Sequence, residues 1–196
     1  MKKIQPYKLL SIICLLLVTN VANANISLGF GEPIQTGSTV NIDVTISGLG
    51  IDEAPSLATY DLDIIFDSSH LSFSSAVFGD SGLGNQLDLF GFGENPADAS
   101  INGITGHLNI YEVSFDDALD LNDLQADSFT LATLTFDALK SDNTQLSFLV
   151  NDLGDADENL LSASLTTGTV STVPVPAAFW LMASGLGLLY RQKIDN

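Results

Sequence analysis

Apolar and polar residues alternate with a period of two along much of the middle of this chain. In residues 39–46, TVNIDVTI, every second residue is a branched apolar one, and the residues between them are threonine, asparagine or aspartate. Residues 60–66, YDLDIIF, alternate in the same way, with two aspartates on the polar side. Successive side chains of a strand point to opposite faces of a sheet. Both segments therefore predict strands with one buried and one solvated face.

Six further segments have the composition of strands: 26–30, 71–78, 108–115, 129–136, 146–150 and 160–170. Sequences rich in Gly, Ser and Asp, such as residues 47–50, separate the strands and are typical of turns. No long helical periodicity appears between residues 25 and 172. Eight or nine short strands over this length predict an all-β fold, a β-sandwich formed by one domain of residues 25–172.

The first 24 residues have the features of a secretory signal peptide. Three lysines precede the apolar run of residues 9–18, and Ala22 and Ala24 form an A-x-A cleavage site. The alternative, a retained N-terminal anchor, is weaker because ten apolar residues are too few to span a bilayer. Cys14 lies in the middle of the apolar run, where it does not fit a lipoprotein signal. The sequence therefore predicts export, with a mature chain beginning near Asn25.

The last 24 residues form a second apolar element. Residues 177–190 carry no charge, begin at Ala177, and include Trp180 and Tyr190, which suit membrane interfaces. A helix of this run would be about 21 Å long, shorter than a bilayer core of about 30 Å. Arg191 and Lys193 follow it and would hold this end in the cytoplasm. The composition predicts a transient membrane segment, which is processed or else retained as a marginal anchor.

Val173, Pro174, Val175 and Pro176 precede this run and favour extended backbone, because proline cannot continue a helix. Proline motif, apolar helix and basic tail together resemble the PEP-CTERM sorting signal, in the variant that continues Ala-Ala-x-Trp-Leu-x-x-Ser-Gly-Leu. The usual Glu between the prolines is Val175 here, and the apolar run is a few residues short. The resemblance implies recognition of residues 173–196 by an exosortase, a membrane-embedded protease-transpeptidase of exopolysaccharide-producing Gram-negative bacteria.

The charge between the two terminal segments is strongly negative. Residues 25–172 contain 23 acidic residues and one basic residue, Lys140, which gives a net charge of −22 with histidine neutral. Such a field repels nucleic acid and anionic membrane surfaces. A solvated surface that keeps an exported protein soluble explains this charge, and binding of Ca²⁺ or cationic groups is the alternative. No cysteine follows Cys14, which excludes disulfides and cysteine chemistry in this domain.

The order of segments in the domain resembles the cohesin-type jelly roll. A strand ending at Gly48 is followed by YDLDIIFD (residues 60–67), by Leu-Ser-Phe at 71–73, by LATLTF at 131–136 and by a closing strand after residue 159. Cohesins bind dockerin partners through a sheet face, and some carbohydrate-binding modules are related to them. The resemblance implies a cohesin-like β-sandwich; no interface motif of those proteins matches here residue by residue.

Two local features are candidate binding sites. Asp152, Asp155 and Asp157 place hard oxygen ligands close together, as Ca²⁺ requires, although an acidic hairpin between strands would have the same composition. The glycine-rich segment 79–93 is predicted to be a flexible crossover pinned by its aromatic residues. Phe90 and Phe92 in it are candidate glycan contacts, since aromatic faces pack on the C–H surfaces of sugar rings.

Nothing in the sequence indicates catalysis. His70 and His107 have no Ser-Asp pattern around them, and no nucleophile elbow is present. With 23 acids in the domain some carboxylates will meet by chance, so paired carboxylates do not by themselves indicate a glycosidase. The sequence predicts an exported, non-enzymatic surface or matrix protein associated with exopolysaccharide. The alternative is a carbohydrate-binding module on the same fold.

Overall fold

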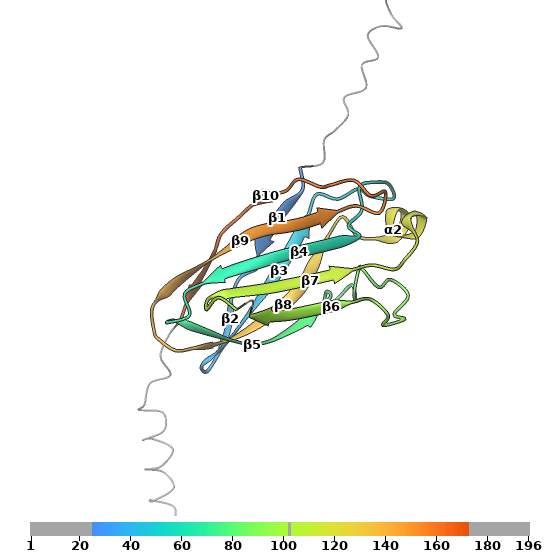
Figure 1. The fold of residues 1–196 in the computed structure, drawn as a ribbon. Helices are drawn as coiled ribbons and strands as arrows, with labels where there is room; N and C mark the ends of the chain where they lie inside the picture. The colour runs from blue at the N-terminus through green and yellow to red at the C-terminus, as the bar shows by residue number, and fades with distance from the viewer. Residues whose placement is uncertain (1–24, 102, 173–196) are drawn as a thin grey trace, which may run out of the picture.

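The computed structural model describes residues 25–101 and 103–172, which form two β-sheets packed face to face. These residues contain eleven strands and one short helix, α2 (Ala118–Leu124) (Figure 1). Within the described ranges, no helix is long and apolar enough to cross a membrane. The predicted cleavage site at Ala22 and Ala24 lies outside them. So do the predicted sorting motif and the flanks of the apolar segment, residues 173–196.

The first sheet has the strand order β10-β1-β3-β8-β5, and β2 pairs with the first three residues of β3. All neighbours are antiparallel except β1 and β10, which are parallel. Its strands are β1 (Ser27–Phe30), β2 (Ile34–Thr36), β3 (Thr39–Ser47), β5 (Leu71–Phe78), β8 (Ser128–Ala138) and β10 (Ser164–Leu165).

The second sheet has the order β11-β9-β4-β7-β6 and is antiparallel throughout. Its strands are β4 (Thr59–Phe66), β6 (Ala97–Ile101), β7 (His107–Val113), β9 (Asn143–Gly154) and β11 (Gly168–Ser171). Strands that are neighbours here, such as β4 and β9, are distant in the sequence, as in other sandwiches with crossing connections.

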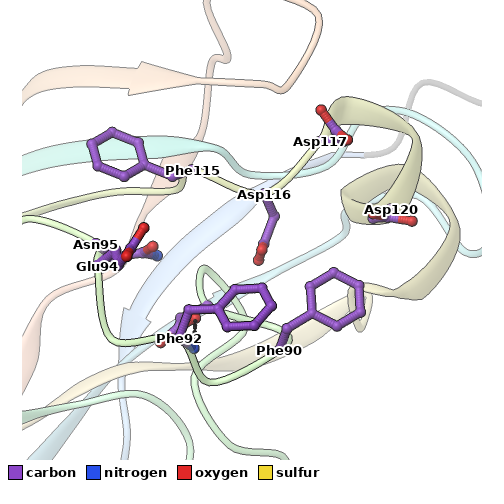
Figure 2. Close-up of a pocket in the computed structure, with 9 residues that line it drawn as sticks. Phe90, Phe92, Glu94, Asn95, Phe115, Asp116, Asp117 and Asp120 are labelled. Atoms are coloured by element: carbon purple, nitrogen blue, oxygen red, sulfur yellow. Dashed lines mark hydrogen bonds between the residues drawn. The ribbon is translucent and has the colours of Figure 1, made fainter.

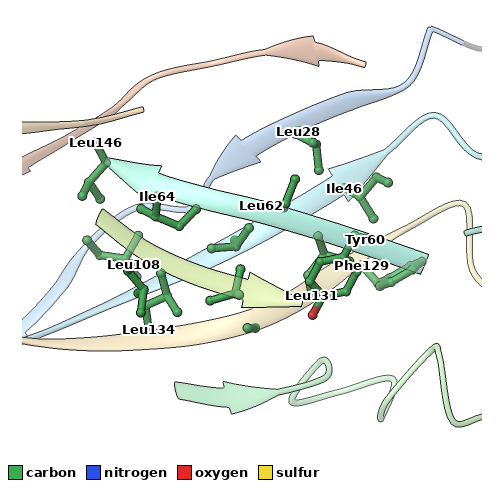
Figure 3. Close-up of a cluster of buried hydrophobic side chains, with 14 of the residues drawn as sticks. Leu28, Ile46, Tyr60, Leu62, Ile64, Leu108, Phe129, Leu131, Leu134 and Leu146 are labelled. Carbon is green, nitrogen blue, oxygen red and sulfur yellow. The ribbon is translucent and has the colours of Figure 1, made fainter. Parts of the chain in front are cut away.

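The core lies between the sheets and is built by the alternation seen in the sequence. Every second residue of β3 from Val40 onward is buried. Leu62 and Ile64 of β4, in the other sheet, have no exposed surface and face β3. Figure 3 shows side chains of this core, among them Ile46, Leu62 and Ile64, between the two layers. Phe30 and Phe148 stack with ring centroids 4.1 Å apart. The predicted two-faced strands and the all-β sandwich are confirmed.

The number of strands exceeds the eight or nine that were predicted. Strand β2 has three residues, and β6 (ADASI) is an edge strand with four of its five residues exposed, so neither shows an apolar alternation. Residues 160–170 were predicted as one strand but form β10 in the first sheet and β11 in the second. Gly168 begins β11, and a Cβ there would lie 2.9 Å from the ring of Phe30, so this close crossing requires glycine.

The two ends of the sandwich are distinct. At one end, the Oγ1 of Thr172 donates to the carbonyl of Lys140, and the described chain stops there. At the other end, α2 and the loop of residues 79–96 lie together (Figure 1). Strand β4 runs between the two ends, and eight residues of strand span about 25 Å.

Candidate functional site

The loop of residues 79–96 connects the two sheets and is held by residues other than those predicted. Its anchor in the core is Leu87, which is 1% exposed, whereas Phe90 and Phe92 are 50% and 73% exposed. The prediction that aromatic residues pin this crossover is wrong, because leucine takes the buried position and leaves the two rings in solvent. Their exposure, which a glycan contact requires, is confirmed; the ligand is untested.

Asp80 fixes the start of this loop. Its Oδ1 accepts hydrogen bonds from the backbone N–H groups of Gly82 and Leu83, and its Oδ2 accepts one from the N–H of Thr130 in β8. These backbone donors, that of Thr130 first, hold the pKa of Asp80 below its ordinary value. The aspartate therefore fastens the loop as an ionised carboxylate at neutral pH.

Two buried glutamines join the loop to the helix. The Oε1 of Gln125 accepts from the N–H of Leu57 at 2.6 Å, and its Nε2 donates to the carbonyls of Leu57 and Gln86, both at 2.8 Å. The Oε1 of Gln86 in turn accepts from the N–H of Ala126 at 2.9 Å. Three segments distant in sequence are thus linked by side-chain amides, which sequence reasoning did not identify because nothing local marks a glutamine as buried.

Helix α2 covers this end of the sandwich. Its sequence ALDLNDL buries Leu121 against the domain, while Leu119 is exposed. Asp117 is the N-cap residue, but its side chain makes no capping hydrogen bond. The carboxylate of Asp117 is therefore left at the surface beside the loop.

A pocket of about 240 Å³ opens between the loop and the start of α2. The exposed rings of Phe90, Phe92 and Phe115 contribute its apolar wall, and Figure 2 shows them with the surrounding carboxylates. Phe90 and Phe92 lie with centroids 5.8 Å apart, tilted by 32°. Its lining residues are Asp88, Phe90, Phe92, Glu94, Asn95, Phe115, Asp116, Asp117 and Asp120. The structure thus adds Phe115 and five acidic residues to the two predicted phenylalanines.

The carboxylates of the pocket fall into two groups. Asp88 accepts from the N–H groups of Phe92 and Gly93, and Asp116 accepts from the N–H of Leu89, so these two shape the loop. The side-chain carboxylates of Glu94, Asp117 and Asp120 accept no hydrogen bond from any described residue. These three are free to act on a ligand.

Beneath the loop lies a buried carboxylate, Glu112 of β7, which is 1% exposed. Tyr60 donates its hydroxyl to Oε2 of Glu112 at 3.2 Å, and Asn85 of the loop donates its side-chain N–H to Oε1 at 2.6 Å. Burial raises the pKa of Glu112, although both donors oppose this shift. Burial also raises the pKa of Tyr60, with the charge of Glu112 adding to the effect.

The raised pKa predicts how stability depends on pH. A group whose pKa is higher in the folded state stabilises the fold below its unfolded pKa, here near 4.5, and loses that contribution as the pH rises through the folded value. Relative to the native protein, Glu112→Gln should therefore gain melting temperature as the pH rises from 4.5 toward the folded pKa of Glu112. The exposed Glu94→Gln removes the same charge and serves as the control. Equal pH dependence in both variants would contradict a special role for Glu112.

The outer face of the second sheet carries a polar network. Asp61 and Asp63 of β4 both accept from the side-chain N–H of Asn109, at 2.6 and 3.0 Å, and Asp61 also accepts from that of Asn151. These are the two aspartates on the polar side of the predicted strand. Amide donors hold both carboxylates within the sheet face.

The three aspartates considered for Ca²⁺ do not converge. The Oδ1 of Asp155 accepts from the N–H groups of Asp157 and Asn159, and its Oδ2 accepts from the side-chain N–H of Asn159. Asp152 lies in β9, and Asp157 is exposed. Across residues 25–101 and 103–172, no group of three or more His, Cys, Asp or Glu side chains is arranged to hold a metal ion. The geometry is that of the acidic hairpin alternative.

Comparisons with known proteins identify the fold. No protein-family model and no curated protein matches this chain. Among solved structures, the sixth cohesin of scaffoldin B from Acetivibrio cellulolyticus, in complex with a Cel5 dockerin mutant, has a TM-score of 0.57 at 18% identity. That match covers 76% of this chain and 99% of the cohesin.

Two further structures agree. The Clostridium thermocellum cohesin of OlpA, in complex with Doc918, has a TM-score of 0.59 at 14% identity, covering 76% of this chain and 99% of that one. A non-cellulosomal cohesin from the archaeon Archaeoglobus fulgidus has a TM-score of 0.54 at 17% identity, covering 80% and 96%. At these identities the similarity concerns the fold, which is a cohesin-like jelly-roll β-sandwich.

Proposed function

We propose that this chain is an exported, non-enzymatic protein of the cell surface or extracellular matrix, whose β-sandwich is a module for binding another protein. The observation that carries the proposal is the exposed trio Phe90, Phe92 and Phe115 around one pocket. Clustered aromatic rings left in water are typical of interaction sites. The cohesins named above, which are in complex with dockerins, support this proposal because they share this fold and bind a protein.

Export and sorting are part of the same proposal and rest on the terminal sequences. The signal peptide of residues 1–24 sends the domain through the inner membrane, and residues 173–196 hold it there transiently until an exosortase processes them. The acidic domain then joins the exopolysaccharide matrix. The position of Thr172 supports this arrangement, because the chain leaves the sandwich at the end opposite the pocket. The binding end would face away from the membrane.

Labelling of intact cells tests the proposal. Gly37 lies in the turn between β2 and β3, and a Cβ there would meet nothing within 4 Å, so an epitope tag inserted beside it should be tolerated. In a host with an exosortase, antibody should label this tag on unbroken cells or in the extracellular fraction. Labelling only after lysis would contradict export to the surface.

A carbohydrate-binding module is the second candidate, favoured by the same exposed rings. Aromatic faces pack on pyranose rings. The free carboxylates of the pocket could accept hydrogen bonds from sugar hydroxyl groups, and the side-chain amide of Asn95 could exchange hydrogen bonds with them as well. Retention of the full chain on immobilised neutral glycans, lost in Phe90→Ala or Phe92→Ala, would establish it. Absence of retention on a broad glycan set would leave protein binding as the function.

A further inference from the structure

We propose that the pocket of Phe90, Phe92 and Phe115 binds an arginine side chain presented by a partner protein. This inference rests on the proposed function and specifies the chemistry of the partner. It follows from three properties of the pocket: its aromatic wall, its uncompensated negative charge and its size.

The aromatic wall suits a guanidinium group. The three rings are half or more exposed, and Phe90 and Phe92 present neighbouring faces with centroids 5.8 Å apart. A planar guanidinium stacks on such faces, and the electron-rich ring attracts its charge. The apolar stem of arginine covers the remaining ring surface, which water now contacts.

The charge around the rings is negative and has no counterion in the described part of the chain. Five acidic side chains line the pocket, and three of them, Glu94, Asp117 and Asp120, have no hydrogen-bond partner among the described residues. Lys140, the single Lys or Arg in the described ranges, lies at the opposite end of the sandwich, where its Nζ donates to Ser69. A cation entering the pocket would therefore complement charges that no internal group offsets.

The same charges argue against a neutral ligand as the best fit. Hydroxyl groups of a sugar would donate hydrogen bonds to the carboxylates but would leave their charge uncompensated. An arginine supplies five donors in a fixed fork to those oxygens. A volume of about 240 Å³ is room for one long side chain. The pocket thus fits a single arginine projecting from a partner surface.

The negative electrostatic field of the whole domain favours association with a basic partner. The domain has a net charge of −22, and a field of one sign raises the association rate of oppositely charged partners. Because the whole domain attracts basic peptides, charge alone cannot identify the pocket. Removal of a ring, which changes no charge, separates the pocket from the field.

The experiment uses the full chain in mild detergent and a fluorescent Gly/Ser peptide that carries several arginines. We expect anisotropy titrations at about 0.15 M salt, where surface fields are screened beyond about 8 Å, to show saturable binding. The same peptide with citrulline, the neutral isostere of arginine, should not bind. Phe92→Ala and Phe115→Ala should each weaken binding about fivefold. Val77→Ala, an exposed apolar truncation on β5, should leave it unchanged.

A double substitution of two pocket aspartates provides a second test in the same binding experiment. The double variant Asp117→Asn, Asp120→Asn should weaken binding and make it less dependent on salt concentration. The control double variant Asp98→Asn, Asp152→Asn changes the net charge by the same amount, but on strands β6 and β9, and should have a smaller effect. Equal effects of the two pairs, or no effect of Phe92→Ala, would overturn the proposal. So would glucosamine oligomers binding more tightly than the arginine peptide, because they would assign the pocket to a cationic sugar.

These outcomes are independent of the proposed function. If the arginine peptide binds through the pocket but the tagged protein never reaches the surface, the proposed function fails and the pocket assignment stands. If the protein is exported and binds a surface protein with an affinity that Phe92→Ala does not change, the proposed function stands and the arginine assignment fails.

Discussion

Replacing Pro174 and Pro176 together with alanine should leave the whole chain in the membrane fraction and abolish its extracellular form. Without the prolines, residues 173–176 could join the helix that the sequence predicts for residues 177–190, and the extended backbone predicted for a processing enzyme to recognise would be lost. Gly185 and Gly187 weaken that helix by roughly 1 kcal/mol each relative to alanine. We therefore expect the native segment to be removed after recognition.

Mass spectrometry of the extracellular protein measures the outcome. Cleavage near residues 173–176 removes Trp180, the single tryptophan of the chain, so the processed form should also lack tryptophan fluorescence. Pro33→Ala changes a proline that precedes β2 in the sandwich and should not affect processing. An extracellular protein with an intact C-terminus ending at Asn196 would refute the sorting signal and leave a marginal membrane anchor in its place.

Gln125→Ala should destabilise the fold by at least about 3 kcal/mol. The truncation leaves the N–H and carbonyl of Leu57 and the carbonyl of Gln86 without their amide partner in a buried site. Each unsatisfied buried group costs about 1–3 kcal/mol. Because this amide links the loop of residues 79–96 to the segment after α2, the variant should also lose ligand binding at the pocket.

Urea unfolding measures this loss as a lower midpoint at unchanged slope. Gln145→Ala removes the same side chain from an exposed position in β9 and should change the free energy of unfolding by no more than about 0.5 kcal/mol. A loss of less than about 1 kcal/mol in Gln125→Ala would mean that water replaces the amide. In that case the two glutamines would not determine the position of the loop.

Most of the strands could be predicted from the sequence because burial on one face imposes a period of two. Strands β3 and β4 lie in the centres of their sheets, and their apolar residues alternate as the sequence indicated. Strand β6 lies at an edge, where little is buried and the pattern disappears. The division of residues 160–170 into β10 and β11 follows from pairing with strands that are distant in sequence, β1 in one sheet and β9 in the other.

The candidate site could be predicted only in part. Phe90 and Phe92 were identified as candidate contacts because aromatic faces pack on the C–H surfaces of sugar rings. Phe115 was expected at the end of a strand, and Asp155 was considered as a metal ligand although its carboxylate holds its own hairpin. Local sequence does not distinguish an acid that caps a turn from one that is free, because the distinction depends on which N–H groups lie nearby.

The sequence by itself determined the faces of the long strands, the acidic surface and the composition of the two terminal segments, since each depends on neighbours within a few residues. Only the tertiary structure decided that Phe115 and α2 meet the loop of residues 79–96. That meeting depends on hydrogen bonds between residues 27 and 39 positions apart, such as Leu89 with Asp116 and Gln86 with Gln125. Contacts of this range form when two sheets pack, and no period along the chain encodes them.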